Sequence, residues 1–180
     1  MDQRPNQATI DQLLVTDGLQ RLWTPYRMEY IDSQRPDQPA RSCPFCLSTG
    51  QADDGLIVTR GESCFVILNR FPYNPGHLLV CPNRHVADYT DLSDEEAYEA
   101  TDLVRAGMKV IRSVSGPAGF NIGLNQGRVA GAGVADHFHI HVVPRWSGDA
   151  NFFPIIAQTK AIPQILADTQ QLLSRAWSQL

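Results

Sequence analysis

Three of the five histidines in this 180-residue chain stand at alternate positions in the stretch ADHFHIHVVPRW, as His137, His139 and His141. Aromatic and β-branched residues between and after them predict a strand, so the three imidazoles would share one face. An imidazole can bind a transition metal, act as a nucleophile or transfer a proton near neutral pH. Because neighbouring same-face positions lie about 6.5 to 7 Å apart, one metal would take two of the three comfortably and a third only with distortion. A strand whose histidines have no function remains the alternative.

A second group able to do chemistry is the pair Cys43 and Cys46 in the sequence CPFC. Cys-x-x-Cys spacing occurs in zinc sites, in redox pairs and in proteins where it does neither. A redox pair is expected near a βαβ pattern, whereas the segment before Cys43 carries two prolines and no periodicity. The remaining cysteines, Cys64 and Cys81, lie in apolar runs and are predicted to be small core residues.

Short β-rich runs must position these groups. Three of them, GLIVT, CFVILN and HLLVCP, are separated by turn-forming Gly and Pro residues and predict an antiparallel meander. FNIGLN predicts a further strand, and the Gly- and Ala-rich loop QGRVAGAGVAD connects it to the histidine stretch. Small residues in that loop would let backbone N–H groups approach an anion closely.

An amphipathic helix is predicted between the meander and FNIGLN. It begins with a capping box, Ser93 to Glu96, and Gly116, Pro117 and Gly119 end it. Spacings of three and four indicate its apolar face, which is expected to include Ala97, Thr101, Val104, Met108 and Ile111. Two further helical patterns lie towards the ends of the chain, from Ile10 and from about Ile162 to Trp177.

The composition narrows the possible functions. Hydrophobic residues make up 43% and charged residues 19%, which is typical of a globular protein. A formal net charge of −4 argues against nucleic acid as a partner held by general attraction to phosphate. No apolar run approaches the roughly 20 residues that span a bilayer, and the N-terminus lacks the apolar core of a secretion signal. We therefore expect a cytoplasmic protein without a membrane partner.

The histidine stretch HFHIHVVP resembles the His-φ-His-φ-His-φ-φ motif (φ, apolar) of the histidine-triad (HIT) nucleotide-binding superfamily. LNRFPYNPGHLLVCPNRHV is similar to that family's strand-turn-strand with Pro-Gly-His, and FNIGLNQG resembles the polar turn before the triad. LQRLWTPYRMEY and HVVPRWSGDANF extend the resemblance to the branch that contains bacterial diadenosine tetraphosphate phosphorylases.

The resemblance implies an α+β, HIT-like fold, in which a five-stranded antiparallel sheet carries a long helix and terminal extensions. It divides the chain into an N-terminal extension with a helix and a loop (1–42), the HIT domain (43–146) and a C-terminal extension with a helix (147–180). The family usually forms homodimers, so a homodimer or a larger homo-oligomer is expected.

The family's functional residues match several positions of this sequence. The middle histidine, His139, corresponds to the nucleophile that attacks the α-phosphorus of a nucleotide, and His141 to a residue that contacts phosphate oxygens beside it. The resemblance also implies nucleotide- or phosphate-binding roles for Asn69 (ribose hydroxyls), His77, Asn125 and the loop glycines Gly131 and Gly133.

For the cysteine pair, the resemblance implies a structural zinc site. Zinc usually takes four ligands, and the chain has no second close cysteine pair, so histidines would complete the set. His85 and His137 match zinc-ligand positions in the relatives that carry Cys-x-x-Cys. The expected ligands are therefore Cys43, Cys46, His85 and His137, which leaves His139 and His141 for the phosphate. A pair without metal remains the alternative.

The function implied is cleavage of dinucleoside polyphosphates, such as diadenosine tetraphosphate, through a nucleotidyl-histidine intermediate. Many hydrolytic relatives carry Gln, Ser or Thr three or four residues before the first triad histidine, where this chain has Gly133 and Val134. That departure favours inorganic phosphate over water as the second acceptor, so ADP and ATP are the expected products. The alternatives are hydrolysis of dinucleoside polyphosphates or of AMP conjugates such as phosphoramidates, and nucleotide binding with little turnover.

Overall fold

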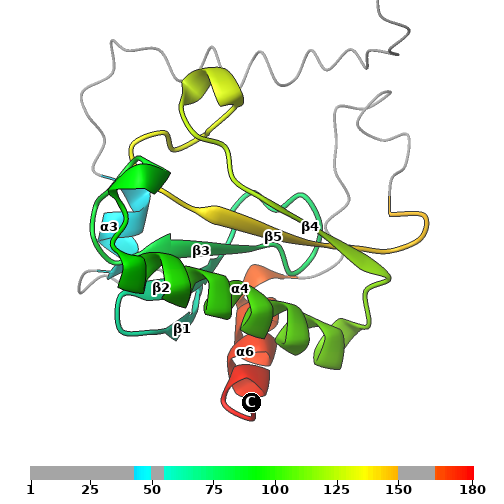
Figure 1. Ribbon diagram of the computed structural model, residues 1–180. Helices are drawn as coiled ribbons and strands as arrows, with labels where there is room; N and C mark the ends of the chain where they lie inside the picture. Colours follow the sequence, from blue (N-terminus) through cyan, green and yellow to red (C-terminus); the bar gives the residue numbers. More distant parts are fainter. Residues whose placement is uncertain (1–42, 50–54, 150–164) are drawn as a thin grey trace, which may run out of the picture. The chain divides into compact units, whose positions relative to one another are not determined.

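The computed structural model describes residues 43–49, 55–149 and 165–180 (Figure 1). Five antiparallel strands form one sheet in the order β1-β2-β3-β5-β4. The strands are β1 (Ile57–Arg60), β2 (Cys64–Leu68), β3 (Leu78–Pro82), β4 (Gly119–Gly123) and β5 (Ile140–Arg145). The predicted five-stranded α+β fold is therefore confirmed. The predicted N-terminal helix and loop, within residues 1–42, lie outside the described residues.

The meander β1-β2-β3 forms three of the five strands of the sheet. Every residue of β2 and β3 is buried, and Cys64 and Cys81 are fully buried core residues, as predicted. The turn that leads into β3 closes with a hydrogen bond from the backbone N–H of His77 to the carbonyl of Asn74. Gly76 in this turn has a φ of 76°, a conformation that glycine adopts without strain. The turn therefore delivers His77 to the start of β3.

Helix α4 (Asp94–Ser115) packs against β2, β3 and β5 (Figure 1). The predicted capping box is confirmed: Ser93 accepts from the backbone N–H of Glu96, and Glu96 accepts from that of Ser93. The predicted apolar face is partly wrong, because Thr101 is exposed. Val104 and Ile111 are buried as predicted, and the other buried residues of α4 are Glu96, Ala100, Gly107 and Val110. Gly107 lets Leu78 and Trp177 approach the helix closely.

The second long helix, α6 (Leu166–Trp177), packs against α4 and β1. The start of its predicted pattern, residues 162–164, lies outside the described residues. Gln170 and Ser174 donate side-chain hydrogen bonds to the carbonyls of Ile57 and Val58 in β1, and Leu173 is buried in the core. The shorter elements are α3 (Pro44–Thr49), η1 (Tyr89–Asp91) and η2 (Arg128–Ala130). No helix in the described ranges is long and apolar enough to cross a membrane.

The histidine stretch differs from its prediction, because β5 begins only at Ile140. The ladder between β3 and β5 ends at the pair Val80–Ile140, and the backbone N–H of Phe138 bonds to the carbonyl of Val86 instead. Pro82 ends β3 and has no N–H with which to extend a ladder. His141 is therefore a strand residue, whereas His137 and His139 lie before the strand. Their backbone groups are thus available for bonds outside the ladder.

Candidate active site

His77 and His141 form a connected pair. The Nδ1 atom of His77 accepts hydrogen bonds from the backbone N–H of Tyr73 (3.1 Å) and from the amide of Asn69 (3.3 Å). The oxygen of that amide accepts from the backbone N–H of Phe71, which fixes the NH2 end towards His77. Since Nδ1 accepts, neutral His77 carries its proton on Nε2, which lies 2.9 Å from Nδ1 of His141. His141 is in turn left with its proton on Nε2.

These contacts make His141 a hydrogen-bond donor through its Nε2–H group. Burial, and secondly the nearby His139, lower the pKa of His141 to about 4, so the ring is neutral at pH 7. A neutral ring with one defined N–H is suited to donate to a phosphate oxygen. We call the chain Tyr73, His77 and His141 the histidine relay.

His139 has the opposite tautomer. Its Nδ1 lies 2.8 Å from the backbone carbonyl of His137, and because a carbonyl only accepts, Nδ1 carries the proton. The Nε2 atom then has a free lone pair. Burial lowers the pKa of His139, which keeps the ring neutral and nucleophilic near pH 7. The His139 and His141 rings are 4.9 Å apart and nearly perpendicular, so a nucleophilic nitrogen and an N–H donor occupy one site.

Two aromatic side chains that the sequence did not single out pack against the histidines. Phe45, between the two cysteines, lies 5.2 Å from the His139 ring and 5.3 Å from the His137 ring. Tyr73 stacks over His141 at 5.8 Å with an interplanar angle of 16°. The position of Phe45 inside CPFC was a usable signal for the first contact. The second depends on how the turn before β3 folds.

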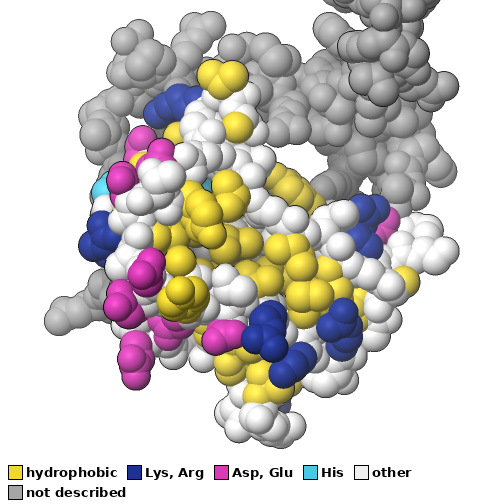
Figure 2. Space-filling model, viewed as in Figure 1, with side chains coloured by type: hydrophobic (Ala, Val, Ile, Leu, Met, Phe, Trp, Pro, Cys, Tyr) yellow, Lys and Arg dark blue, Asp and Glu magenta, His cyan; other side chains and the backbone are white. Residues whose placement is uncertain are grey.

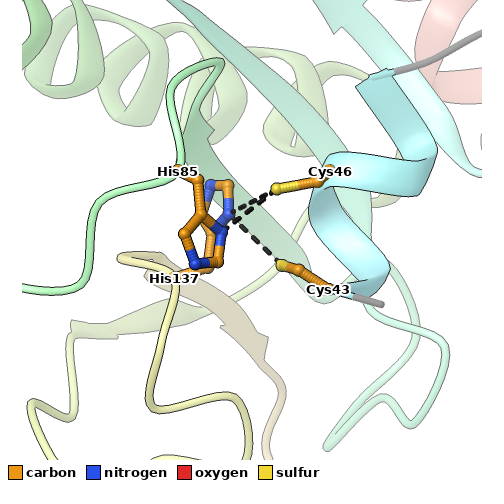
Figure 3. A group of neighbouring side chains, drawn as sticks. All are labelled: Cys43, Cys46, His85 and His137. Atoms are coloured by element: carbon orange, nitrogen blue, oxygen red, sulfur yellow. Dashed lines mark hydrogen bonds between the residues drawn. The ribbon is translucent and has the colours of Figure 1, made fainter. Parts of the chain in front are cut away.

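The two cysteines meet His85 and His137, as predicted (Figure 3). The four ligand atoms lie within 4.8 Å of one another. Nδ1 of His137 is 3.4 Å from Sγ of Cys43 and 3.6 Å from Sγ of Cys46, and Nδ1 of His85 is 3.1 Å from Sγ of Cys46. Nε2 of His137 lies 3.0 Å from the carbonyl of Pro82, which leaves Nδ1 as an acceptor facing the sulfurs. This group, the Cys/His cluster, could bind a metal ion.

The Cys/His cluster fits a tetrahedral cation well. Zn–S bonds of about 2.3 Å and Zn–N bonds of about 2.05 Å place sulfur and nitrogen about 3.6 Å apart in a tetrahedral site. Two of the three sulfur–nitrogen distances come within a few tenths of an ångström of that value. Burial, with Cys43 beside it, raises the pKa of the Cys46 thiol. A cation would offset this effect by stabilising the thiolates.

The remaining predicted residues lie in two places. Asn69 contacts His77, as described above. Asn125 follows β4 and is half-buried, Gly131 ends η2 with a φ of 89°, and Gly133 is half-buried in the loop before His137. The second group therefore belongs to the segment that leads directly into the triad. Gln126 in the same segment accepts from the backbone N–H of Tyr89, which attaches the segment to η1.

A polar network that the sequence did not predict lies beside the turn before β3. Asp149 accepts two hydrogen bonds from the Arg145 guanidinium, at 2.6 and 2.8 Å, and one from the Asn74 amide at 2.7 Å. Asn74 also donates to the carbonyl of Pro144 at 2.9 Å. The turn is thus joined to the far end of β5.

Comparison with known proteins gives a family match over more than half of the chain. A family model described as HIT domain matches residues 50–148. The chain is 44% identical over 193 aligned residues to the AP-4-A phosphorylase of Mycobacterium tuberculosis, in two strains, and the alignment covers 98% of this chain and 97% of that protein.

Solved structures agree with this match. A zinc-bound histidine triad family protein from Mycobacterium smegmatis is 28% identical, with a TM-score of 0.63, and the alignment covers 77% of this chain and 94% of that one. A hypothetical histidine triad nucleotide-binding protein from Sulfolobus tokodaii is 26% identical, with a TM-score of 0.64, and the alignment covers 77% of this chain and 93% of that one. The similarity therefore extends to the arrangement of the elements.

Proposed function

The chain belongs to the histidine-triad (HIT) family, and on this premise we propose that it cleaves diadenosine tetraphosphate by phosphorolysis to ADP and ATP. The observation that carries the proposal is the tautomer of His139, whose Nδ1–H is held by the His137 carbonyl so that Nε2 is free to attack. The extensive similarity to a protein named AP-4-A phosphorylase supports the choice of substrate and acceptor. The nonpolar residues Gly133 and Val134 before the triad favour phosphate over water.

In the first step, Nε2 of His139 attacks the α-phosphorus of the substrate. A P–N bond forms, the P–O bond to the leaving group breaks, and the bonding electrons leave with the oxygen of ATP. The ring then carries a positive charge and keeps its proton on Nδ1, where the His137 carbonyl stabilises it. His141 donates its Nε2–H to a non-bridging oxygen and thereby stabilises charge that develops in the transition state.

In the second step, an oxygen of inorganic phosphate attacks the same phosphorus. The P–N bond breaks, its electrons return to Nε2, and ADP is released. Two displacements at one nitrogen replace one difficult displacement, which is the usual advantage of a covalent intermediate. His139 returns to the neutral tautomer with which it began.

The residues around His139 and His141 would bind the substrate. We assign the ribose hydroxyls to Asn69, and the phosphates to Asn125 and the backbone of Gly131 and Gly133. His77 is fully buried and both of its ring nitrogens are engaged, so it would act on the phosphates only through His141. Asn69 would bind the ribose with the remaining acceptor capacity of its oxygen, because its NH2 group faces His77. The glycines would allow backbone N–H groups to approach phosphate oxygens.

For the Cys/His cluster we propose a structural zinc ion bound by Cys43, Cys46, His85 and His137. Thiolate and imidazole are ligands that zinc prefers, and four protein ligands leave no open position for a reacting water. Bound zinc would tie α3 to the segment before β5 and hold His137 in place. Elemental analysis of the purified protein, before and after chelation, tests this assignment.

We also propose that the protein forms a two-fold homodimer through α4 and β4. Exposed acidic residues occupy the first half of α4, including Asp94, Glu95 and Asp102, and basic residues its second half, Arg105, Lys109 and Arg112 (Figure 2). Hydrophobic side chains are exposed nearby, at Tyr98, Ile122 and Leu124. Two antiparallel copies of α4 would place each acidic half opposite a basic half.

Sedimentation of the wild type and of a double variant, Arg105→Glu with Lys109→Glu, tests the homodimer. The wild type should sediment as a dimer or a larger assembly, and the variant as a monomer. A monomeric wild type contradicts the proposal. Location in the cytoplasm stays a prediction from the sequence.

The decisive test of the reaction is product identity. Incubation with diadenosine tetraphosphate should give ADP and ATP, and the rate should depend on added inorganic phosphate. Omission of phosphate should leave adenylylated His139, which mass spectrometry can detect. AMP and ATP formed without phosphate would show hydrolysis instead. Nucleotide binding without turnover or adduct would reject the catalytic role.

A further inference from the structure

We infer that Asp149 is a positioning residue for the proposed reaction: through Asn74 it holds the turn that sets the tautomer of the histidine relay. Asp149 lies 72 positions after His77 in the chain, and its carboxylate does not contact the histidines directly. Its effect would pass through one residue, Asn74, whose side chain joins the turn to the end of β5. The inference deepens the proposed function and rests on it for the activity measurements alone.

The Asp149 carboxylate has its acceptor capacity filled. One oxygen accepts from Asn74 at 2.7 Å, from Nε of Arg145 at 2.6 Å and from the backbone N–H of Trp146 at 3.1 Å. The other accepts from Nη2 of Arg145 at 2.8 Å. Four donors surround two oxygens, which suits an ionised carboxylate and no other side chain of this size. Arg145 is itself oriented by Asn121, whose oxygen accepts from Nη1 at 2.6 Å.

Asn74 connects the Asp149 carboxylate to the turn before β3. Its side-chain amide donates to Asp149 and to the Pro144 carbonyl, and its backbone carbonyl accepts from the backbone N–H of His77 at 3.1 Å. The preceding residue, Tyr73, supplies the backbone N–H that bonds to Nδ1 of His77. A shift of Asn74 therefore moves both the backbone of His77 and the donor that fixes its tautomer.

The consequence reaches the catalytic pair through the hydrogen bond from Tyr73 to Nδ1 of His77, the shorter of the two that this nitrogen accepts. If the Tyr73 donor is displaced, only the 3.3 Å bond from Asn69 opposes a proton on Nδ1 of His77. Once Nδ1 is protonated, Nε2 faces Nδ1 of His141 as an acceptor. His141 would in that case point a lone pair at the phosphate in place of its Nε2–H group. Displacements of about 1 Å in such positioning contacts can cost about 10²-fold in rate. The Asp149–Asn74 contact is thus expected to matter for turnover more than for substrate binding.

The test exchanges the charges of the contact. Asn74→Asp places a second carboxylate against Asp149, and should lower kcat about 10²-fold with KM changed less than about threefold. Asp149→Asn turns one acceptor into a donor that faces other donors, and should lower kcat about tenfold. The double variant, Asn74→Asp with Asp149→Asn, removes the repulsion between two carboxylates, but the carboxylate at position 74 cannot donate to the Pro144 carbonyl. It should therefore recover part of the lost rate, about tenfold over Asn74→Asp. Asp168→Asn, which removes one exposed carboxylate in the first turn of α6, is the matched control and should keep wild-type kcat.

A second measurement does not depend on activity. Long-range ¹⁵N NMR of the imidazoles reports which nitrogen of each histidine carries a proton. The wild type should show His77 and His141 protonated on Nε2, Asn74→Asp should shift both towards mixed tautomers, and the double variant should shift them back. Thermal unfolding identifies any variant that fails to fold, and Asp149→Asn serves as the milder change.

Unchanged imidazole signals in folded Asn74→Asp and Asp149→Asn overturn the inference, as does wild-type kcat in both. A double variant that is no better than Asn74→Asp also overturns it. If the wild type has no phosphorolytic activity while the NMR signals change as expected, the proposed function fails and the positioning by Asp149 stands.

Discussion

His137 and His139 are two residues apart, yet the backbone uses opposite nitrogens of their rings. In the Cys/His cluster, the Pro82 carbonyl takes Nε2 of His137 and leaves Nδ1 facing two sulfurs. In the neighbouring site, the His137 carbonyl takes Nδ1 of His139 and leaves Nε2 as a nucleophile. One carbonyl contact per ring decides which nitrogen is available. In the proposed function, identical side chains would thereby serve as a metal ligand and as a catalyst.

The two sites also share atoms. His137 offers its ring to the Cys/His cluster and its carbonyl to His139, and Phe45 packs against both rings. The comparison therefore predicts that the sites differ in function but are coupled in position. Substitutions at one site should change its own chemistry strongly and the other site weakly.

The largest effect is expected from His139→Gln, which removes the proposed nucleophile. Turnover of diadenosine tetraphosphate should fall by at least about 10³-fold, or about 4 kcal/mol in activation free energy. The metal content should equal that of the wild type, since His139 contacts the cluster only through its hydrogen bond to the His137 carbonyl. Product assays and elemental analysis of the same preparation check both statements. A covalent adduct in this variant would contradict the assignment of the nucleophile.

The complementary change is Cys46→Ser in the Cys/His cluster. The variant should lose its metal, and with it about 2.7 kcal/mol of unfolding free energy at a free zinc concentration about 100 times the dissociation constant. Chelator should destabilise the wild type and leave Cys46→Ser unaffected. Activity should fall much less than in His139→Gln. Equal stability of both proteins with zinc present would show that the cluster binds no metal.

A smaller difference in activity is expected between His77→Gln and His77→Leu. Glutamine keeps an N–H that can donate to Nδ1 of His141, whereas leucine has no polar atom. The glutamine variant should therefore be about tenfold more active than the leucine variant, a difference of about 1.4 kcal/mol. Metal content should be the same in both. Equal activities would mean that His77 acts only by filling space.

The smallest effect concerns pH and stability. The folded-state pKa of His141, about 4, lies below the ordinary value of 6.5, so between those values the unfolded chain binds a proton that the folded chain does not. The contribution of neutral His141 to the unfolding free energy should be fully present above pH 6.5 and should fall as the pH drops towards 4. The fall should be less than about 1.4 kcal/mol per pH unit, because the ring is partly exposed. His141→Asn should show a flatter dependence in urea titrations. An identical slope would contradict the lowered pKa.

Much of the fold could be predicted from local patterns. Strands β1 to β4 and the Ser93–Glu96 capping box are properties of short sequence segments, and the structure confirms them. The start of β5 could not be predicted so well, because it depends on where β3 ends. The error at Thr101 has a related origin: burial along α4 is decided by the strands and by Trp177, not by helical spacing alone.

The site divides in the same way. Cys43, Cys46, His85 and His137 were predicted as a group, and they lie together. The ring tautomers could not be predicted, since they are set by carbonyls and backbone N–H groups at Tyr73 and His137 that carry no side-chain signature. The contact between Asn74 and Asp149 joins positions 75 residues apart, and neither residue stands out in the sequence.

The hydrogen bonds from α6 to β1 have a consequence for assembly. Edge strands invite pairing with other chains, and proteins protect them by occupying or covering the exposed backbone groups. Gln170 and Ser174 occupy carbonyls of β1, so helix α6 covers one edge of the sheet. Within the part of the chain that the structure describes, β4 is the edge where another strand could add. A sheet with one open edge can grow once, by pairing with its own copy, and then stops. The helix thus favours a closed pair over an open-ended fibre.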